Sequence, residues 1–221
     1  MQLSQKQNEI IRGKLKAYNI AVGVTGSGKS FAMNIRFYSE ICRLPENHTV
    51  MLTGNTNDSL YKNVITELLK IDAGIGWLEY TRSPSRIKTK NGVEVFCIGV
   101  NNEGADNRIQ GGSVELWYAD EPTTYPKTAY DMCLSRCRGI GLQGKLEIKP
   151  VLMTLNPDDD QHFIKKDIID RRETMNAAIS ETCDSSNREY QLTTSVFLTS
   201  LRGNGEPLCS SLAETKYRDN R

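Results

Sequence analysis

The feature that most constrains this chain is a glycine-rich segment at residues 23–30, GVTGSGKS, with the G-x-x-x-x-G-K-[ST] spacing of a phosphate-binding loop. Glycines let the backbone curl so that successive N–H groups point at phosphate oxygens. The Lys29 ammonium would neutralise the β- and γ-phosphates, and the Ser30 hydroxyl would bind Mg²⁺. A glycine-rich surface turn before an ordinary helix is the alternative. The residues predicted to contact nucleotide are Gly23, Val24, Thr25, Gly26, Ser27, Gly28, Lys29 and Ser30.

The residues on either side of this loop favour nucleotide binding over the alternative. Residues 18–22 form a short apolar run that is typical of a strand, and apolar side chains recur at helical spacing over residues 31–42. A second buried strand is predicted at residues 49–53. The alternation of strand, helix and strand predicts a parallel sheet.

A tight hairpin and several further elements follow along the chain. Asn91 and Gly92 predict a turn between residues 86–90 and 93–98, because both turn positions require positive φ. We therefore predict an α/β fold with a mostly parallel sheet, flanking helices and a β-hairpin insertion. The other predicted elements are a helix capped by Asn57 or Asp58, a strand at residues 114–119, a helix at 127–138, a strand at 151–154 and a helix at 162–170.

The strand predicted at residues 114–119 ends in two adjacent acidic residues, Asp120 and Glu121. We expect this strand to lie next to the phosphate-loop strand. There Asp120 would hold Mg²⁺ through water and Glu121 would polarise the water that attacks the γ-phosphate. The alternative is an exposed acidic turn before Pro122.

Thr154 and Asn156 follow the next predicted strand, at the edge where ligands bind open α/β sheets. We expect them to sense the γ-phosphate. Guanine-specific enzymes and ordinary helicases lose support, because Asn-Lys-x-Asp is absent and DEPT replaces the D-E-x-[DH] tetrad of many helicases. The motifs together predict a P-loop ATPase of the additional-strand, RecA-like class.

The composition supplies weaker constraints. The 28 Lys and Arg residues nearly balance 27 Asp and Glu, so any contact with nucleic acid must come from local patches. The N-terminus does not have the pattern of a signal peptide, and no apolar run is long enough to span a membrane, so we expect no membrane partner. The six cysteines contain no Cys-x-x-Cys pair, and we expect reduced, buried thiols rather than a zinc site.

The densest basic stretch, which runs into the predicted hairpin, consists of Arg82, Arg86, Lys88 and Lys90. Alternating side chains on a hairpin could follow a phosphate backbone without reading bases. A solvated hairpin is an equally good interpretation of the same stretch.

The order of these motifs resembles the ATPase half of the large terminase subunits of tailed bacteriophages. The matching blocks, over residues 3–170, are LSQKQNEII, GVTGSGKS, IGVNNEGADNRIQG, VELWYADEPTTYP, SRCRG and MTLNPDDDQHFIKKDII. The resemblance implies a motor that hydrolyses ATP to push double-stranded DNA of any sequence through a portal into a procapsid. It also implies a ring of subunits, a small terminase subunit as partner, and a location in the host cytoplasm and transiently at the portal vertex.

The same resemblance implies roles for individual residues. Gln7 matches the glutamine that reads adenine, and a solvated helix residue is the alternative. Thr154 and Asn156 match the motif that couples hydrolysis to movement. The positions that match the phosphate, Mg²⁺ and acidic motifs are Lys29, Ser30, Asp120 and Glu121.

The chain departs from this family in its phosphate loop. Many terminases place an arginine inside the loop, but the variable positions here hold Val24, Thr25, Gly26 and Ser27. An arginine elsewhere in the chain, or in a neighbouring subunit, must then stabilise the transition state. The candidates are Arg108, Arg136 and Arg138.

A second departure concerns the nuclease that forms the other half of such proteins. No nuclease residues can be assigned, and the three aspartates at 158–160 are interpreted as a solvated acidic turn. We predict an ATPase domain at residues 1–170 and an extension or linker remnant at residues 171–221, where no core could be assigned.

Two other functions fit the motifs. The first is a RecA-like helicase or recombination ATPase, which would displace strands without a capsid. The second is a nucleotide-gated assembly module that binds ATP without motor activity. Strand displacement tests the first, and tight ATP binding without turnover would support the second.

Overall fold

The computed structural model describes residues 3–109, 112–140, 146–156, 162–164, 166, 168 and 194–198, with backbone alone for 138–140, 146–148 and 194–198. The helices are α1 (Gln5–Arg12), α2 (Lys29–Arg43), α3 (Asn57–Leu60), the π-helix η1 (Tyr61–Ile65), α4 (Thr66–Asp72), α5 (Ala105–Ile109), the 3₁₀ turn η2 (Pro122–Thr124) and α6 (Lys127–Arg136). The strands are β1 (Tyr18–Val22), β2 (Thr49–Gly54), β3 (Leu78–Arg82), β4 (Ser85–Thr89), β5 (Glu94–Gly99), β6 (Leu116–Asp120), β7 (Arg138–Ile140), β8 (Leu146–Ile148), β9 (Val151–Leu155) and β10 (Thr194–Leu198).

Eight of these strands form one sheet in the order β10-β1-β9-β6-β2-β5-β4-β3. The strands from β10 to β5 are parallel, and β4 and β3 continue the sheet in antiparallel pairing. Strands β7 and β8 form a separate antiparallel pair. Because parallel strands all run the same way, the loops after β1, β9, β6, β2 and β5 gather at one edge of the sheet.

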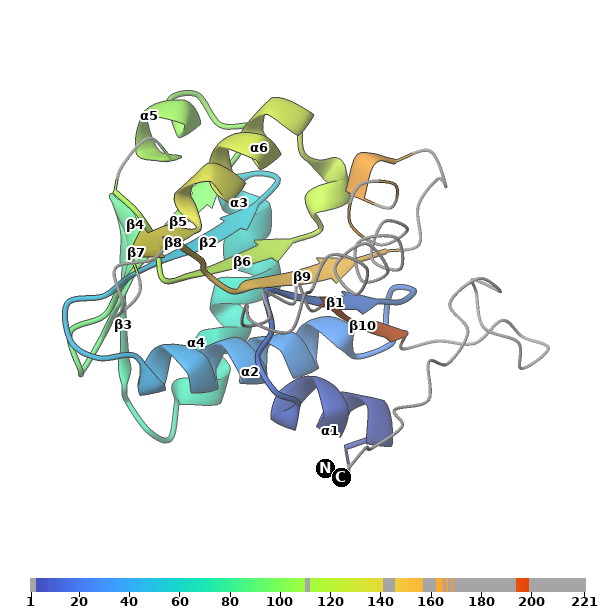
Figure 1. The fold of residues 1–221 in the computed structure, drawn as a ribbon. Helices are drawn as coiled ribbons and strands as arrows, with labels where there is room; N and C mark the ends of the chain where they lie inside the picture. The colour runs from blue at the N-terminus through green and yellow to red at the C-terminus, as the bar shows by residue number, and fades with distance from the viewer. Residues whose placement is uncertain are drawn as a thin grey trace, which may run out of the picture.

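Helices cover both faces of this sheet (Figure 1). Helices α1 to α4 contribute to the core on one face, and α5 and α6 contribute to the core on the other. Strand β6 serves both cores, because successive side chains of a strand point to opposite faces. Tyr118 packs with Phe37 of α2, whereas Trp117 packs with Tyr130 of α6. Full burial of each such ring stabilises the fold by about 1.5–3 kcal/mol.

The α/β fold and the hairpin of β4 and β5 confirm the sequence-based predictions, but of the two turn residues only Gly92 has a positive φ, at 81°. One prediction about strand order was wrong, because β9 lies between the acidic strand β6 and the phosphate-loop strand β1. Each of these strands is buried on both faces, so its apolar pattern does not specify its neighbours. The cap predicted at Asn57 or Asp58 is instead Thr56, whose side chain accepts from the Ser59 N–H.

Two strands of the sheet were missed in the sequence. Strand β3 carries polar residues and is half exposed, so its apolar signal is weak. Strand β10 pairs in parallel with β1, although it lies in the polar region to which no core had been assigned. The domain boundary at residue 170 stays a prediction. Residues 158–160, and residues 165, 167, 169 and 170 of the predicted helix at 162–170, lie outside the described residues.

The described cysteines behave as the sequence suggested. Cys97, Cys133 and Cys137 are buried, Cys42 is half buried, and all four are free thiols. No helix in the described part of the chain is long and apolar enough to cross a membrane.

Candidate functional site

Three loops meet at the carboxyl edge of the sheet and bring the predicted motifs together. The phosphate loop follows β1, the acidic residues end β6, and Asn156 follows β9. The Gly23 N–H donates to the Leu155 carbonyl oxygen at 3.1 Å, which joins the start of the phosphate loop to the end of β9. The insertion of β9 therefore places Thr154 and Asn156 between the phosphate loop and the acidic pair.

The phosphate loop depends on two glycines with positive φ, Gly26 at 81° and Gly28 at 78°. Gly28 immediately precedes α2, so the N-terminal dipole of a 15-residue helix faces the loop. A Cβ atom at Gly28 would also collide with the side-chain amide of Gln7. The left-handed backbone conformation therefore requires glycine at position 28, whereas the flexible Gln7 amide can shift to relieve the contact.

Lys29, the first residue of α2, is held in the site by a neutral side chain. Its side chain is buried, and Nζ donates to Asn156 Oδ1 at 2.7 Å. Burial lowers the pKa of the Lys29 ammonium, and the nearby carboxylates of Glu121 and Asp120 partly offset this effect. Lys29 of the phosphate loop thus lies close to Asn156 and to the acidic pair, as its predicted contact with phosphate requires.

The first acidic residue, Asp120, is 6% exposed and accepts a hydrogen bond from Thr154 Oγ1 at 2.8 Å. Burial raises the pKa of its carboxyl to about 6, and the charge of Glu121 adds to this. The Thr154 hydrogen bond and Lys29 act in the opposite direction. In the described part of the chain, the other carboxylate oxygen has no hydrogen-bond partner. Carboxylate and hydroxyl oxygens are ligands that Mg²⁺ accepts, so Asp120 and Ser30 are the residues that could hold the ion.

The second acidic residue, Glu121, is held in an unusual backbone conformation. Its φ of 50° and ψ of 53° lie in the left-handed region, which costs a non-glycine residue about 1–2 kcal/mol. Hydrogen bonds hold it there, since its N–H donates to the Thr154 carbonyl oxygen and its own carbonyl accepts from Thr124 Oγ1. Its carboxylate accepts from Asn156 Nδ2 at 2.6 Å. Asn156 therefore bridges Lys29 and Glu121.

Tyr125 stabilises the turn that carries Asp120 and Glu121, a role that was not predicted from the sequence. Its buried hydroxyl donates to the Asp120 carbonyl oxygen at 3.0 Å and is hydrogen-bonded to Thr53 Oγ1 at 3.1 Å. Thr53 also accepts from Trp117 Nε1 at 2.8 Å. The tyrosine four residues after Glu121 was the available signal, but its partner Thr53 is distant in sequence.

Gln7 lies beside the phosphate loop, as its predicted role requires. Its Nε2 makes a weak contact of 3.5 Å with the Gly28 carbonyl oxygen. Its Oε1 accepts from the Ser4 N–H at 2.9 Å and so forms one half of the capping box of α1. Adenine recognition by Gln7 stays a prediction.

The three candidate arginines do not meet at this site. The Arg136 carbonyl oxygen accepts from the Val114 N–H, at the edge of the sheet opposite Asp120. Six residues of extended chain separate Val114 from Asp120, or about 20 Å. Arg138 follows on the same side, in β7. Arg108 is exposed on α5, next to the ends of β2 and β5. Within one chain, Arg136 and Arg138 are too far from the phosphate loop to reach it.

A phosphate loop after β1, an acidic pair after β6 and the strand β9 between them define a P-loop NTPase of the additional-strand class. The family model described as "Terminase large subunit, T4likevirus-type, N-terminal" matches residues 20–204. The chain belongs to this family.

Solved structures agree with this assignment at the level of the fold. The large terminase of a thermophilic bacteriophage superposes with a TM-score of 0.68 at 18% identity, over 89% of this chain and 53% of that one. The same phage protein in complex with ATP-γ-S gives 0.65 at 21%, over 79% and 43%. The large terminase ATPase domain of Thermus phage P74-26 gives 0.51 at 15%, over 71% and 66%.

The chain spans about half of the first of these large terminases. A search of curated proteins finds no sequence that matches the chain.

Proposed function

We propose that this chain is the ATP-hydrolysing motor domain that translocates double-stranded viral DNA into a procapsid. Membership of the terminase family supports this proposal. The large terminase of the thermophilic bacteriophage has been solved in complexes with ADP and with ATP-γ-S, which supports a nucleotide at the equivalent edge of the sheet. In this proposal Lys29, Glu121 and Asp120 carry out hydrolysis, and β9 couples hydrolysis to movement of the DNA.

The bridge from Lys29 through Asn156 to Glu121 carries the proposal most directly. One carboxamide accepts from the ammonium that would bind phosphate and donates to the carboxylate that would polarise water. The oxygens of a γ-phosphate would compete with Asn156 for Lys29, because an oxyanion is the stronger acceptor. Asn156 would then shift relative to Glu121, and β9 would register whether the γ-phosphate is present.

The remaining groups of the site divide the chemistry of hydrolysis. Ser30, and Asp120 through water, would hold Mg²⁺, whose positive charge would offset the charge of the phosphates. Glu121 would orient and polarise the attacking water, and its left-handed backbone fixes where its carboxylate points. The backbone N–H groups of the loop and of the start of α2 would cradle the phosphates.

An arginine is still required at the transition state, and we propose that a neighbouring subunit of a ring supplies it. Arg108 is the best candidate, because it is exposed at the same edge of the sheet as the phosphate loop. Arg136 and Arg138 lie at the opposite edge and would need a different contact between subunits. The portal, the procapsid and the small terminase subunit are the proposed partners, in the host cytoplasm.

Two substitutions test the hydrolytic site. Lys29→Ala and Glu121→Gln should each lower steady-state ATP turnover by at least about 100-fold. Lys29→Ala should also weaken nucleotide binding, whereas Glu121→Gln should leave it within a few-fold. The matched controls are Lys14→Ala and Glu103→Gln, which change exposed residues away from the site and should leave turnover unchanged. Normal turnover in either site variant contradicts the assignment.

Translocation requires a separate measurement. DNA packaged into procapsids should be lost in both site variants, and turnover should rise when portal and DNA are added to the wild-type protein. Displacement of a DNA strand without any capsid would instead favour a RecA-like helicase. Tight ATP binding that never leads to turnover, even with portal and DNA present, would favour an assembly module.

A further inference from the structure

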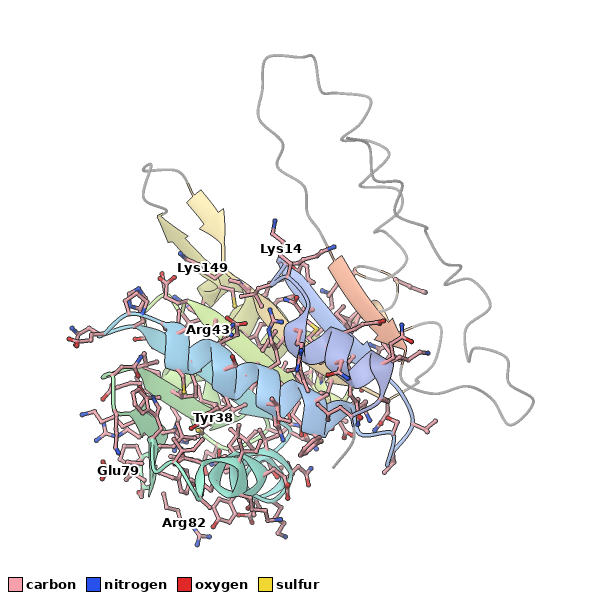
Figure 2. The ribbon with its side chains drawn as sticks, turned by 90° about the horizontal axis from the view of Figure 1, so that it is seen from below. Lys14, Tyr38, Arg43, Glu79, Arg82 and Lys149 are labelled. Carbon is pink, nitrogen blue, oxygen red and sulfur yellow. The ribbon has the colours of Figure 1, made fainter. Side chains whose placement is uncertain are left out.

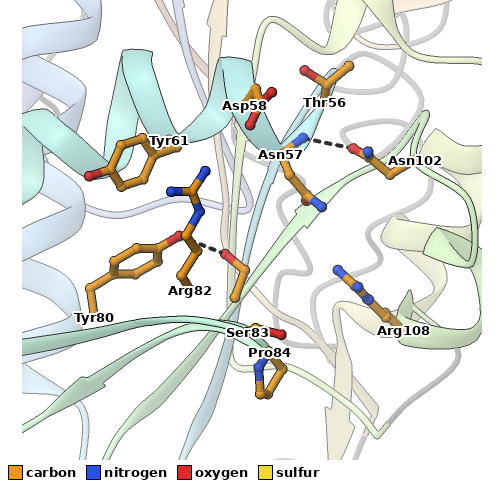
Figure 3. A pocket seen from close by; sticks show the side chains of 11 residues that line it. Thr56, Asn57, Asp58, Tyr61, Tyr80, Arg82, Ser83, Pro84, Asn102 and Arg108 are labelled. Atoms are coloured by element: carbon orange, nitrogen blue, oxygen red, sulfur yellow. Dashed lines mark hydrogen bonds between the residues drawn. The ribbon is translucent and has the colours of Figure 1, made fainter.

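A second polar cavity opens at the same edge of the sheet as the phosphate loop, beyond the ends of β2 and β5 (Figure 3). Its volume is about 460 Å³, and the turn between β3 and β4 forms one wall. Three to four strand spacings separate it from the phosphate-loop strand, or about 15–19 Å. None of the residues that surround Lys29 lines it.

Two asparagines in the wall offer side-chain NH₂ groups to a ligand. The Asn57 side-chain oxygen accepts from the Gly99 N–H at 2.7 Å, and the Asn102 side-chain oxygen accepts from the Asn57 N–H at 2.8 Å. These hydrogen bonds fix the orientation of both carboxamides, and each NH₂ group can donate to a ligand. Among the described residues, neither NH₂ group has a hydrogen-bond partner.

Two arginines reach the same space from different elements. Arg82 comes from the end of β3 and Arg108 from α5, and Figure 3 shows them on different sides of the cavity. In the part of the chain that the structure describes, neither guanidinium has a carboxylate within ion-pair distance. By contrast, Arg86 and Lys88 of the neighbouring strand β4 both form ion pairs with Glu94, each at 3.6 Å. Asp58 is the single acidic residue in the wall.

Two tyrosines, Tyr61 and Tyr80, complete the wall of the cavity. The rings of Tyr61 and Tyr80 lie 5.6 Å apart, and the Arg82 guanidinium lies 5.9 Å from the centre of the Tyr61 ring. A stacked guanidinium keeps its N–H edge free to donate. A cavity of this volume accommodates a phosphate with its sugar, but it is too small for a DNA duplex, which can enter only by one backbone group.

We propose that this cavity binds a phosphate ester, held by Arg82, Arg108 and the NH₂ groups of Asn57 and Asn102. Convergent charged and neutral donors suit a phosphate, which presents only acceptors. The phosphate has two possible sources, a phosphodiester of the DNA being moved or the nucleotide of a neighbouring subunit. The choice of source rests on the proposed motor function, but the site itself does not.

Two variants test the site without touching the hydrolytic residues. Arg82→Ala removes one exposed cation. Asn102→Asp keeps the oxygen that accepts from the Asn57 N–H, so the fold should be retained, but it replaces the donor by an anionic oxygen. The matched controls are Arg86→Ala, which removes an equal charge from the hairpin outside the cavity, and Asn107→Asp, which adds an equal charge nearby. Thermal unfolding verifies that all four variants fold.

The probes are a dye-labelled 30-base-pair DNA followed by fluorescence anisotropy, and ATP turnover followed against protein concentration. If the source is DNA, both test variants should weaken duplex binding about tenfold at low salt. Arg82→Ala should also reduce the slope of log affinity against log salt by about 0.9, while the controls stay near wild type. If the source is a neighbour's nucleotide, DNA binding should not change, and turnover should lose its dependence on protein concentration.

Test variants that match the wild type in both assays overturn the site. Equal losses in test and control variants also overturn it, because they would reflect overall charge. Failure of the motor function is separate, since it would appear as wild-type protein that neither turns over ATP nor packages DNA. Binding of labelled DNA through the cavity would still be measurable in that case.

Discussion

The phosphate-loop site and the cavity beside the turn between β3 and β4 lie at the same edge of one sheet, but their positively charged side chains differ in burial and in hydrogen-bond partners. Lys29 is buried, hydrogen-bonded to Asn156 and close to two carboxylates. Arg82 and Arg108 are exposed and lack carboxylate partners in the described structure. A buried network is preorganised for one reaction geometry, whereas exposed cations suit a ligand that binds and leaves repeatedly.

This comparison orders the expected effects of substitution. Removal of a member of the buried network leaves polar groups unsatisfied at low dielectric, so the loss should be large and almost independent of salt. Changes to exposed charges should be small and screened by salt.

Among the residues that support the site, the largest effect is expected for Asn156→Ala, which removes the bridge between Lys29 and Glu121. Turnover should fall by about 100-fold, with nucleotide binding changed much less, because the phosphate contacts of the loop remain. Steady-state kinetics that separate kcat from KM provide the measurement. Asn107→Ala, on the exposed side of α5, is the control. An unchanged kcat would show that the bridge has no part in hydrolysis.

Asp72 should produce the next largest effect, on stability rather than turnover. This buried carboxylate accepts from the N–H groups of Trp77 and Leu78 and from the Tyr38 hydroxyl, at 2.8, 2.9 and 2.8 Å. It thereby joins α2 to the start of β3. Figure 2 shows Tyr38 beside α2, which lies in front of the sheet in that view. Asp72→Asn would oppose an NH₂ group to a backbone N–H and should destabilise the fold by about 2–3 kcal/mol at pH 7.

The same residue predicts a dependence of stability on pH. Burial alone would raise the pKa of Asp72, but the hydrogen bonds from Leu78, Trp77 and Tyr38 outweigh it, and the pKa is lowered in the fold. A lowered pKa contributes stability that is present above the unfolded value, about 3.9, and is lost as the pH falls through the folded value. The free energy of unfolding of the wild type, measured with urea, should therefore fall below about pH 4. The Asp72→Asn variant should lose less stability over that range.

Tyr125→Phe should have an intermediate effect on both properties. Loss of its hydroxyl removes the hydrogen bonds to the Asp120 carbonyl and to Thr53, so the unfolding free energy should fall by about 1 kcal/mol. Turnover should fall several-fold because the turn that carries Glu121 is less firmly held. Tyr130→Phe is the matched control, since the Tyr130 hydroxyl is buried without a hydrogen-bond partner among the described residues. Equal losses in the two variants would contradict a positioning role for Tyr125.

The smallest effect is expected for Glu94→Gln on the hairpin. Its ion pairs with Arg86 and Lys88 are partly exposed, so their loss should change the unfolding free energy by no more than about 0.5 kcal/mol. This small change should disappear at high salt, whereas the effect of Asn156→Ala on turnover should persist. A salt-independent loss of more than about 1 kcal/mol would remove the distinction between the two regions.

The extent to which the site could be predicted follows the same division between local and distant contacts. The phosphate loop is local, because Gly23, Gly28 and Lys29 act through the backbone of one turn and the helix that follows. The hairpin at Asn91 and Gly92 is local for the same reason. Tyr125 was missed because its role depends on Thr53, which lies on another strand.

The basic hairpin shows how a correct element can carry an incomplete interpretation. The sequence indicated a dense run of positive charge over residues 82–90. In the structure, Glu94 pairs with two of these cations, so the run does not form one uniform patch. Arg82 instead faces the cavity together with Arg108, which is distant in sequence.

The sequence by itself determined the phosphate-loop motif, because the spacing of its glycines, lysine and serine reflects the conformation of one short backbone segment. Tertiary structure alone decided that β9 lies between β1 and β6, so that Asn156 bridges Lys29 and Glu121. It also placed Arg136 at the wrong edge of the sheet and left Arg108 exposed. The physical reason is that strand order and the pairing of distant side chains result from packing across the whole sheet, to which each apolar run contributes alike.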